Sequence, residues 1–121
     1  YEGSVGSTGI SLAALARTRG YRAHICMPDD QGCEKSELLV HLGAIVERVA
    51  VAPITSPRHY VNLARRRAAD HADLARDGSR GFFADQFESP ANWLAHLRST
   101  GPEILAQTAG RLDAFVAGAG T

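Results

Sequence analysis

The chain has 121 residues, enough for one compact domain with a core, and its 45% of hydrophobic residues argues against disorder. The 13 basic and 13 acidic residues give a formal net charge of zero, so charge gives no reason to expect nucleic acid or an anionic membrane as a partner. Apolar runs are too short to span a bilayer, and the two cysteines are typical of a reduced intracellular protein rather than of a disulfide scaffold.

Predicted strands and helices alternate along the sequence. Ser7 or Thr8 is placed to cap a helix that runs over 10–19 and stops at Gly20. We expect the strand that leads into this helix to lie upstream of Tyr1. Periodicity, proline and glycine then indicate strands at 21–27, 44–51, 81–85 and 112–121, and helices at 33–42, 56–77, 89–98 and 101–108.

This alternation is typical of an α/β fold, a Rossmann-like parallel sheet with helices on both faces in three αβα layers. Ligands of such sheets bind beyond the carboxyl ends of the strands, where the loop before the first helix and the terminal "GAGT" both fall. The chain opens at Tyr1 without a methionine, so we expect an internal piece of a longer protein and only part of the sheet.

Glycine and hydroxyl residues are concentrated in "EGSVGSTGIS", residues 2–11. Glycines let a ligand approach the backbone, and the free N–H groups at a helix start favour a carboxylate or a phosphate. The hydroxyls of Ser4, Ser7 and Thr8 add donors. The same pattern also fits a glycine-rich turn with a hydroxyl cap. It is neither a P-loop, because no lysine follows the last glycine, nor the G-x-G-x-x-G dinucleotide motif.

The remaining polar and aromatic residues are interpreted as structural. No histidine or cysteine pair has a metal-ligand spacing, so we predict no metal site, and Cys26 reads as a buried small hydrophobe. Alternating charges predict a solvated, salt-bridged helix face formed by Arg65, Arg66, Arg67, Asp70, Asp73 and Asp77. Aromatic residues expected to pack in the interior are Phe82, Phe83, Trp93 and Phe115.

Taken together, the segments resemble the fold-type II pyridoxal-phosphate enzymes, the cysteine synthase and cystathionine β-synthase family. The family's "TSGNTG" loop is similar to "SVGSTG" at 4–9, and its "MPE…ERRKLL…LGA" block to "MPDDQGCEKSELLVHLGA" at 27–44. Its "QF…NPAN…TTGPEI" block is similar to 86–104, and its strand into "G-x-GTGGT" to "DAFVAGAGT" at 113–121. The resemblance implies a tryptophan synthase β-like fold, present in part, and pyridoxal 5′-phosphate as cofactor.

The resemblance also implies a role for each matching position. The carboxylate of an amino-acid substrate would be bound by Ser4, Gly6, Ser7, Thr8 and Gln86. Ser7 would face the phenolic oxygen of the cofactor, while Gly120 and Thr121 would begin its phosphate site. Residues 1–85 would belong to a smaller, mobile substrate-binding domain, and residues 86–121 would enter the larger cofactor domain.

Two positions depart from the family pattern, since Val5 replaces a serine and Ser7 an asparagine. They indicate a divergent, cysteine synthase-like branch whose preferred amino acid differs. The only lysine, Lys35, matches an ordinary basic helix position and not the lysine that forms the Schiff base, which the family has upstream of the opening loop. This piece therefore contains no catalytic residue and is expected to be inactive alone.

The resemblance implies that the whole protein is an enzyme of amino-acid biosynthesis, a transferase or lyase that acts on O-acetylserine or a related O-substituted serine and adds a thiol or sulfide. Alternatives are a serine or threonine deaminase and a non-catalytic amino-acid-binding protein; a nucleotide-binding Rossmann domain is a further one. We expect a homodimer in an intracellular compartment, cytoplasmic or mitochondrial, with a small-molecule substrate and neither nucleic acid nor a membrane segment.

Overall fold

A computed structural model of the chain describes residues 1–74, 78–118 and 120–121, with the side chains of all of these except 72–74. The described residues form two compact units, Tyr1–Asp85 and Gln86–Thr121. In the described part of the chain, no helix combines the length and the apolar character that a membrane crossing requires.

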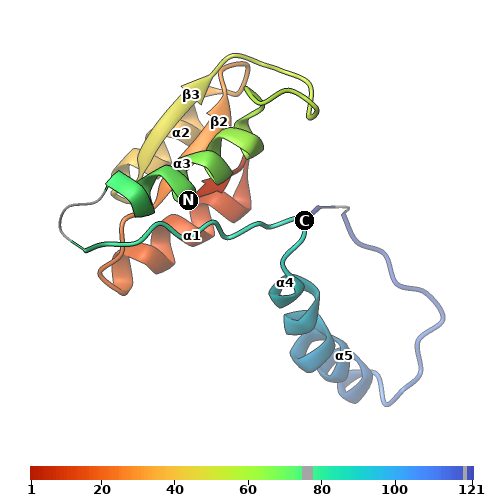
Figure 1. The fold of residues 1–121 in the computed structure, drawn as a ribbon. Helices are drawn as coiled ribbons and strands as arrows, with labels where there is room; N and C mark the ends of the chain where they lie inside the picture. Colours follow the sequence, from red (N-terminus) through yellow and green to blue (C-terminus); the bar gives the residue numbers. More distant parts are fainter. Residues whose placement is uncertain (75–77, 119) are drawn as a thin grey trace. The chain divides into compact units, whose positions relative to one another are not determined.

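The first unit is built on a three-stranded parallel sheet in the order β1-β2-β3 (Figure 1). Its strands are β1 (Glu2–Gly3), β2 (His24–Pro28) and β3 (Ile45–Val49). Glu2 stands opposite Ile25, and Cys26 stands opposite Glu47. The predicted α/β class and parallel sheet are confirmed. The prediction placed the strand that leads into the first helix upstream of Tyr1, but a strand is already present within the chain, because Glu2 and Gly3 at the start of the glycine-rich stretch pair with β2.

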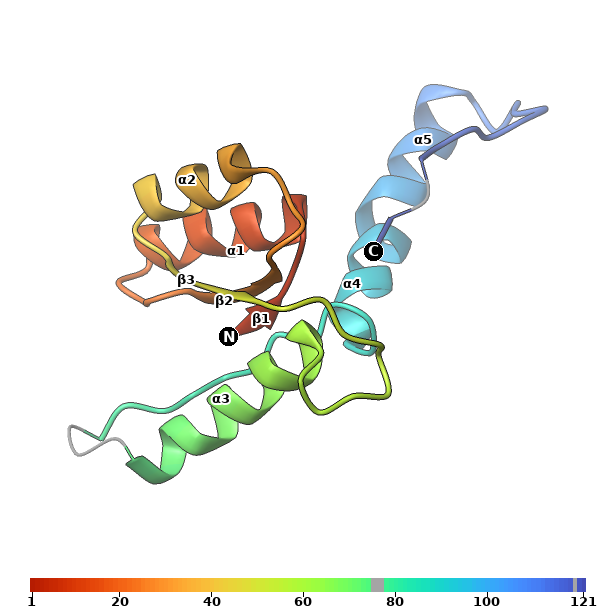
Figure 2. The ribbon, with the colours of Figure 1, turned by 90° about the horizontal axis from the view of Figure 1, so that it is seen from above.

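Helices cover both faces of this sheet (Figure 2). The helices α1 (Ser7–Thr18) and α2 (Cys33–His41) lie on one face, and α3 (Tyr60–Leu74) lies on the other. Because side chains alternate along a strand, Ile25 and Met27 pack with Ala13 of α1 and Leu39 of α2, whereas Cys26 packs toward α3. Cys26 has no exposed surface, as predicted. The three layers are thus α, β and α.

Two predicted boundaries in this unit change. The helix predicted from residue 56 begins at Tyr60, because two turns precede it. In these turns the Ser56 N–H donates to the Pro53 carbonyl and the His59 N–H donates to the Ser56 carbonyl. Its predicted last residues, 75–77, lie outside the described residues. The predicted strand 81–85 is not a strand of the sheet, although its backbone exchanges hydrogen bonds with Tyr1 through Phe82 and Ala84 at 2.7 and 3.0 Å.

The second unit contains one helical run. It consists of α4 (Pro90–Ala95), the π-helical turn η1 (His96–Thr100) and α5 (Gly101–Gln107), which corresponds to the two predicted helices. The strand predicted at 112–121 is wrong for the described residues, since none of them in this unit forms a strand with which it could pair. For the same reason Trp93 and Phe115 are exposed rather than packed against a sheet; Phe82 of the first unit is exposed as well.

Candidate functional site

The loop after β1 is shaped by Ser4. The Ser4 N–H donates to the Cys26 carbonyl at 3.0 Å, which continues the pairing of β1 with β2. The Ser4 hydroxyl accepts from the N–H groups of Gly6 at 3.3 Å and Gly9 at 3.0 Å, and Ser4 is only 3% exposed. The helix cap therefore differs from the prediction: Gly6 is the N-cap residue, and Ser4, not Ser7 or Thr8, satisfies the N–H of the third helical residue.

Gly9 is what allows Ser4 to approach the helix. A Cβ atom at this position would lie 3.2 Å from both the Cβ and the Oγ of Ser4, and 3.3 Å from the Cγ2 of Ile25. These distances are shorter than ordinary van der Waals contacts. The glycine thus fixes the distance between the opening loop and the first turn of α1.

Ser7 and Thr8 remain open to a ligand. Within the part of the chain that the structure describes, neither their N–H groups nor their hydroxyls make a hydrogen bond, and the first turn of α1 holds no acidic residue. Ser7 is exposed and Thr8 half-buried. Two N–H groups and two hydroxyls at a helix start, where the dipole is positive, suit an anion such as a carboxylate.

Lys35 joins this loop from α2. Its Nζ donates to the Val5 carbonyl at 3.1 Å. No local pattern predicted this contact, because Lys35 lies 30 residues further along the chain.

Two predicted site residues of the second unit lie in contact. The Thr121 hydroxyl donates to the Gln86 side-chain oxygen at 2.6 Å, and the Gln86 carbonyl accepts from the Asn92 side chain at 3.2 Å. Gly118 and Gly120 have open space where a Cβ would stand, so a ligand can approach their backbone. The structure thus places Ser4, Gly6, Ser7 and Thr8 in one loop of the first unit and brings Gln86 to Thr121 in the second.

The face of the sheet toward α3 holds a polar cluster that the sequence did not predict. Glu47 of β3 accepts from Arg67 of α3 at 2.7 and 3.1 Å and pairs with His24 of β2 at 3.1 Å, while the Cys26 thiol lies 3.8 Å from the same carboxylate. Period-two alternation places His24 and Cys26 on one strand face, the signal that could have revealed the cluster. Arg67 therefore does not belong to the solvated helix face that we predicted. Arg65 does lie on an exposed face, where it pairs with Asp85 at 3.4 Å. The predicted partners Asp73 and Asp77 lie outside the described side chains.

The structure describes this cluster as an ion pair with neutral neighbours. The possible ligand atoms of His24, Cys26 and Glu47 do lie within 4.8 Å of one another. However, the hydrogen bonds from Arg67 lower the pKa of Glu47 to about 2, so the guanidinium already neutralises this carboxylate. Burial raises the pKa of the Cys26 thiol to about 12 and lowers the pKa of His24, so both neighbours stay uncharged at neutral pH.

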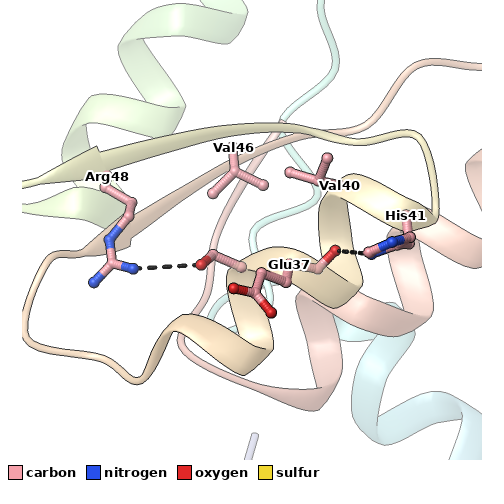
Figure 3. A pocket seen from close by; sticks show the side chains of 6 residues that line it. Glu37, Val40, His41, Val46 and Arg48 are labelled. Carbon is pink, nitrogen blue, oxygen red and sulfur yellow. Dashed lines mark hydrogen bonds between the residues drawn. The ribbon is translucent and has the colours of Figure 1, made fainter.

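A shallow hollow lies between α2 and β3 (Figure 3). Arg48 closes one end of it by donating to the Ser36 hydroxyl at 3.3 Å, and the His41 ring bonds the Glu37 carbonyl at 2.8 Å. None of the predicted site residues lines this hollow. The candidate site is therefore the loop before α1 and not this surface depression.

A parallel α/β sheet with a glycine- and hydroxyl-rich loop between its first strand and first helix is typical of a large class of ligand-binding and enzyme domains. Within that class, the family model "Pyridoxal-phosphate dependent enzyme" matches residues 1–121, and the chain belongs to this family. The cofactor of this family is pyridoxal 5′-phosphate.

Two curated relatives and one solved structure are similar to this chain. The chain is 71% identical over its whole length to 26% of "Cysteine synthase 2" of Neurospora crassa. It is 51% identical, again over its whole length, to 30% of "Putative mitochondrial cysteine synthase" of Saccharomyces cerevisiae. A crystal structure of O-ureido-L-serine synthase matches this chain with a TM-score of 0.76 and 33% sequence identity. The match covers 93% of this chain and 33% of the synthase chain. The chain thus spans about a quarter to a third of these relatives' length.

The residues present fit part of a pyridoxal-phosphate site. Open glycine backbone at 118 and 120 and the Thr121 hydroxyl are donors of the kind that a phosphate needs. The one lysine of the sequence is held by the Val5 carbonyl. The described groups at 118, 120 and 121 are thus of the kind that bind and orient a phosphate.

Proposed function

We propose that the whole protein is a cysteine synthase-like enzyme that uses pyridoxal 5′-phosphate. It would replace the β-substituent of O-acetylserine or a related O-substituted serine with a thiol, sulfide giving cysteine. The observation that carries the proposal is the open set of donors on Ser7 and Thr8 at the start of α1. The 71% identity to a curated cysteine synthase supports the choice of reaction.

The loop of residues 4–8 binds the α-carboxylate of the substrate in this proposal. The N–H groups of Ser7 and Thr8 and the Thr8 hydroxyl donate to it, and Gln86 is a further ligand. The Ser4 hydroxyl accepts from the Gly6 and Gly9 N–H groups and donates its own proton to the Gly6 carbonyl at 3.5 Å, and Ser4 is buried. We therefore assign Ser4 to the set as the residue that keeps the loop in its binding shape.

The cofactor, when bound, withdraws electrons from the substrate's α-carbon so that the β-substituent can leave. This chain's part is to bind and orient. Gly120 and Thr121 begin the phosphate site, and the Ser7 hydroxyl faces the phenolic oxygen of the ring. The loop of residues 4–9 closes over the carboxylate and excludes water. Residues 1–85 belong to the smaller, mobile substrate-binding domain, and residues 86–121 enter the larger cofactor domain.

Kinetics of the full-length protein loaded with pyridoxal phosphate test this assignment. Formation of cysteine from O-acetyl-L-serine and sulfide is the expected activity. We expect Thr8→Ala to raise the KM for O-acetyl-L-serine about tenfold, since it removes a hydrogen bond to a charged group, with little change in cofactor affinity. Ser11→Ala, one turn further along the exposed side of α1, is the matched control and leaves both constants unchanged. Equal loss of both ligands in Thr8→Ala would contradict the role of the loop.

Two other functions are alternatives, because Val5 and Ser7 replace a serine and an asparagine of the family loop. Release of ammonia from L-serine without added thiol would identify a deaminase. Binding of amino acids without turnover and without cofactor absorbance would identify a non-catalytic binding protein.

We further propose a homodimer in an intracellular compartment. The name of the Saccharomyces cerevisiae relative supports mitochondria over the cytoplasm. Size-exclusion chromatography with light scattering and cell fractionation of the full-length protein test the two proposals.

A further inference from the structure

Lys35 of α2 reaches the loop that opens α1. Its Nζ donates to the Val5 carbonyl at 3.1 Å, and the two helices lie side by side on one face of the sheet (Figure 2). Lys35 is exposed and is the only lysine of the sequence. An ammonium group therefore stands at the edge of the candidate site.

This contact holds one particular peptide group. The Val5 carbonyl and the Gly6 N–H belong to the same planar peptide unit. Lys35 holds the carbonyl end, and the Ser4 hydroxyl holds the N–H end at 3.3 Å. A planar group held at both ends is restrained from rotating, and this restrains the backbone that leads to the N–H groups of Ser7 and Thr8 before a ligand arrives.

Lys35 also adds charge where the helix dipole is already positive. The first turn of α1 contains no acidic residue to offset it. A carboxylate bound by Ser7 and Thr8 is thus attracted by the ammonium as well as by the N–H groups.

We propose that Lys35 is a positioning residue for the α-carboxylate of the amino-acid substrate, because it fixes the Val5–Gly6 peptide and supplies a positive charge. This rests on the proposed role of the loop in carboxylate binding. Lys35 touches the loop and not the reacting atoms, so its removal weakens amino-acid binding and leaves the affinity for pyridoxal phosphate unchanged.

Arg17 offers a matched control. It is also an exposed cation that joins α1 to α2 by donating to a backbone carbonyl, that of His41, at 3.1 Å. It lies ten residues after Ser7, about 15 Å along the helix axis from the loop. A general effect of linking the two helices would appear in both variants, whereas an effect on the loop appears only at Lys35.

The test uses the full-length protein loaded with pyridoxal phosphate and L-alanine as the probe, because L-alanine has the carboxylate but no leaving group. The dissociation constant for L-alanine is measured from the absorbance of the bound cofactor, and that for pyridoxal phosphate by fluorescence. We expect Lys35→Met to raise the first constant about three- to tenfold. Lys35→Arg, which keeps charge and donor, and Arg17→Met stay within about twofold of the wild type, and all variants keep their cofactor affinity.

Thr8→Ala separates the two levels of the proposal. If Thr8→Ala weakens L-alanine binding and Lys35→Met does not, the loop binds the carboxylate without help from Lys35 and this inference is wrong. If neither variant weakens it, the proposed function of the loop fails, and the inference fails with it. Equal loss of L-alanine and cofactor in both Lys35→Met and the milder Lys35→Gln would make Lys35 merely structural.

Discussion

Glu47 and Arg67 join the sheet to α3 by a contact whose energy can be measured. The Arg67 Nη2 and Nε donate to the two oxygens of the Glu47 carboxylate at 2.7 and 3.1 Å. Replacing Glu47 by glutamine removes its charge at nearly constant volume, and replacing Arg67 by glutamine removes its charge with a shorter side chain. Because two parallel N–H to oxygen bonds hold one geometry, the pair is stronger than a single surface contact.

The size of the contribution follows from the pKa of Glu47. Hydrogen bonds from Arg67 lower this pKa from 4.5 to about 2, which corresponds to at most about 3 kcal/mol. The Glu47 side chain is 26% exposed and that of Arg67 40%, so solvent screening reduces the expected coupling to about 1–2 kcal/mol. Since the folded-state pKa is depressed, the contribution is complete above pH 4.5 and is lost as the pH falls from 4.5 toward 2.

A double-mutant cycle of Glu47→Gln and Arg67→Gln measures this coupling from the hydrogen-exchange stability of β2 and α3 in the full-length protein at pH 7.5. The Arg65–Asp85 pair is the matched control: it joins at 3.4 Å, Arg65 is 54% exposed, and its coupling is expected below about 0.5 kcal/mol. A Glu47–Arg67 coupling no larger than that of the control pair would refute the reasoning.

Two further predictions concern packing and exposure in the first unit. Gly9→Ala is expected to lower the free energy of unfolding by about 1–3 kcal/mol, and the melting temperature by several degrees, because its Cβ would press on Ser4 and Ile25. Gly6→Ala is the control and costs less, because the space around its Cβ is open. Equal losses of melting temperature for the two variants would contradict this packing. Cys33 is exposed and is expected to react with Ellman's reagent in the native protein. Cys26 is fully buried, and burial raises the pKa of its thiol to about 12, so it is expected to react only on unfolding. Rapid reaction of both thiols in the native protein would contradict this prediction.

Local signals in the sequence were sufficient for most elements of the first unit. Gly20 takes a φ of 73° after α1, and Gly43 a φ of 85° after α2, the left-handed conformation that ends a helix. The apolar residues of 24–28 are buried on both faces of β2, as expected of a central parallel strand. The glycine and hydroxyl residues before α1 indicated the loop and the helix start that follows it, because helix starts depend on neighbours in the chain.

Tertiary structure alone decided which of these groups are free. Ser4, Ser7 and Thr8 look alike in sequence, yet the Ser4 hydroxyl turns inward to Gly6 and Gly9 while the other two stay open. The contacts of Lys35 with Val5 and of Arg67 with Glu47 span 30 and 20 residues. No local propensity encodes such contacts, because they exist only once separate helices have packed on the same sheet. The strand predicted at 112–121 fails for the same reason, since a strand requires a partner to complete its hydrogen bonds.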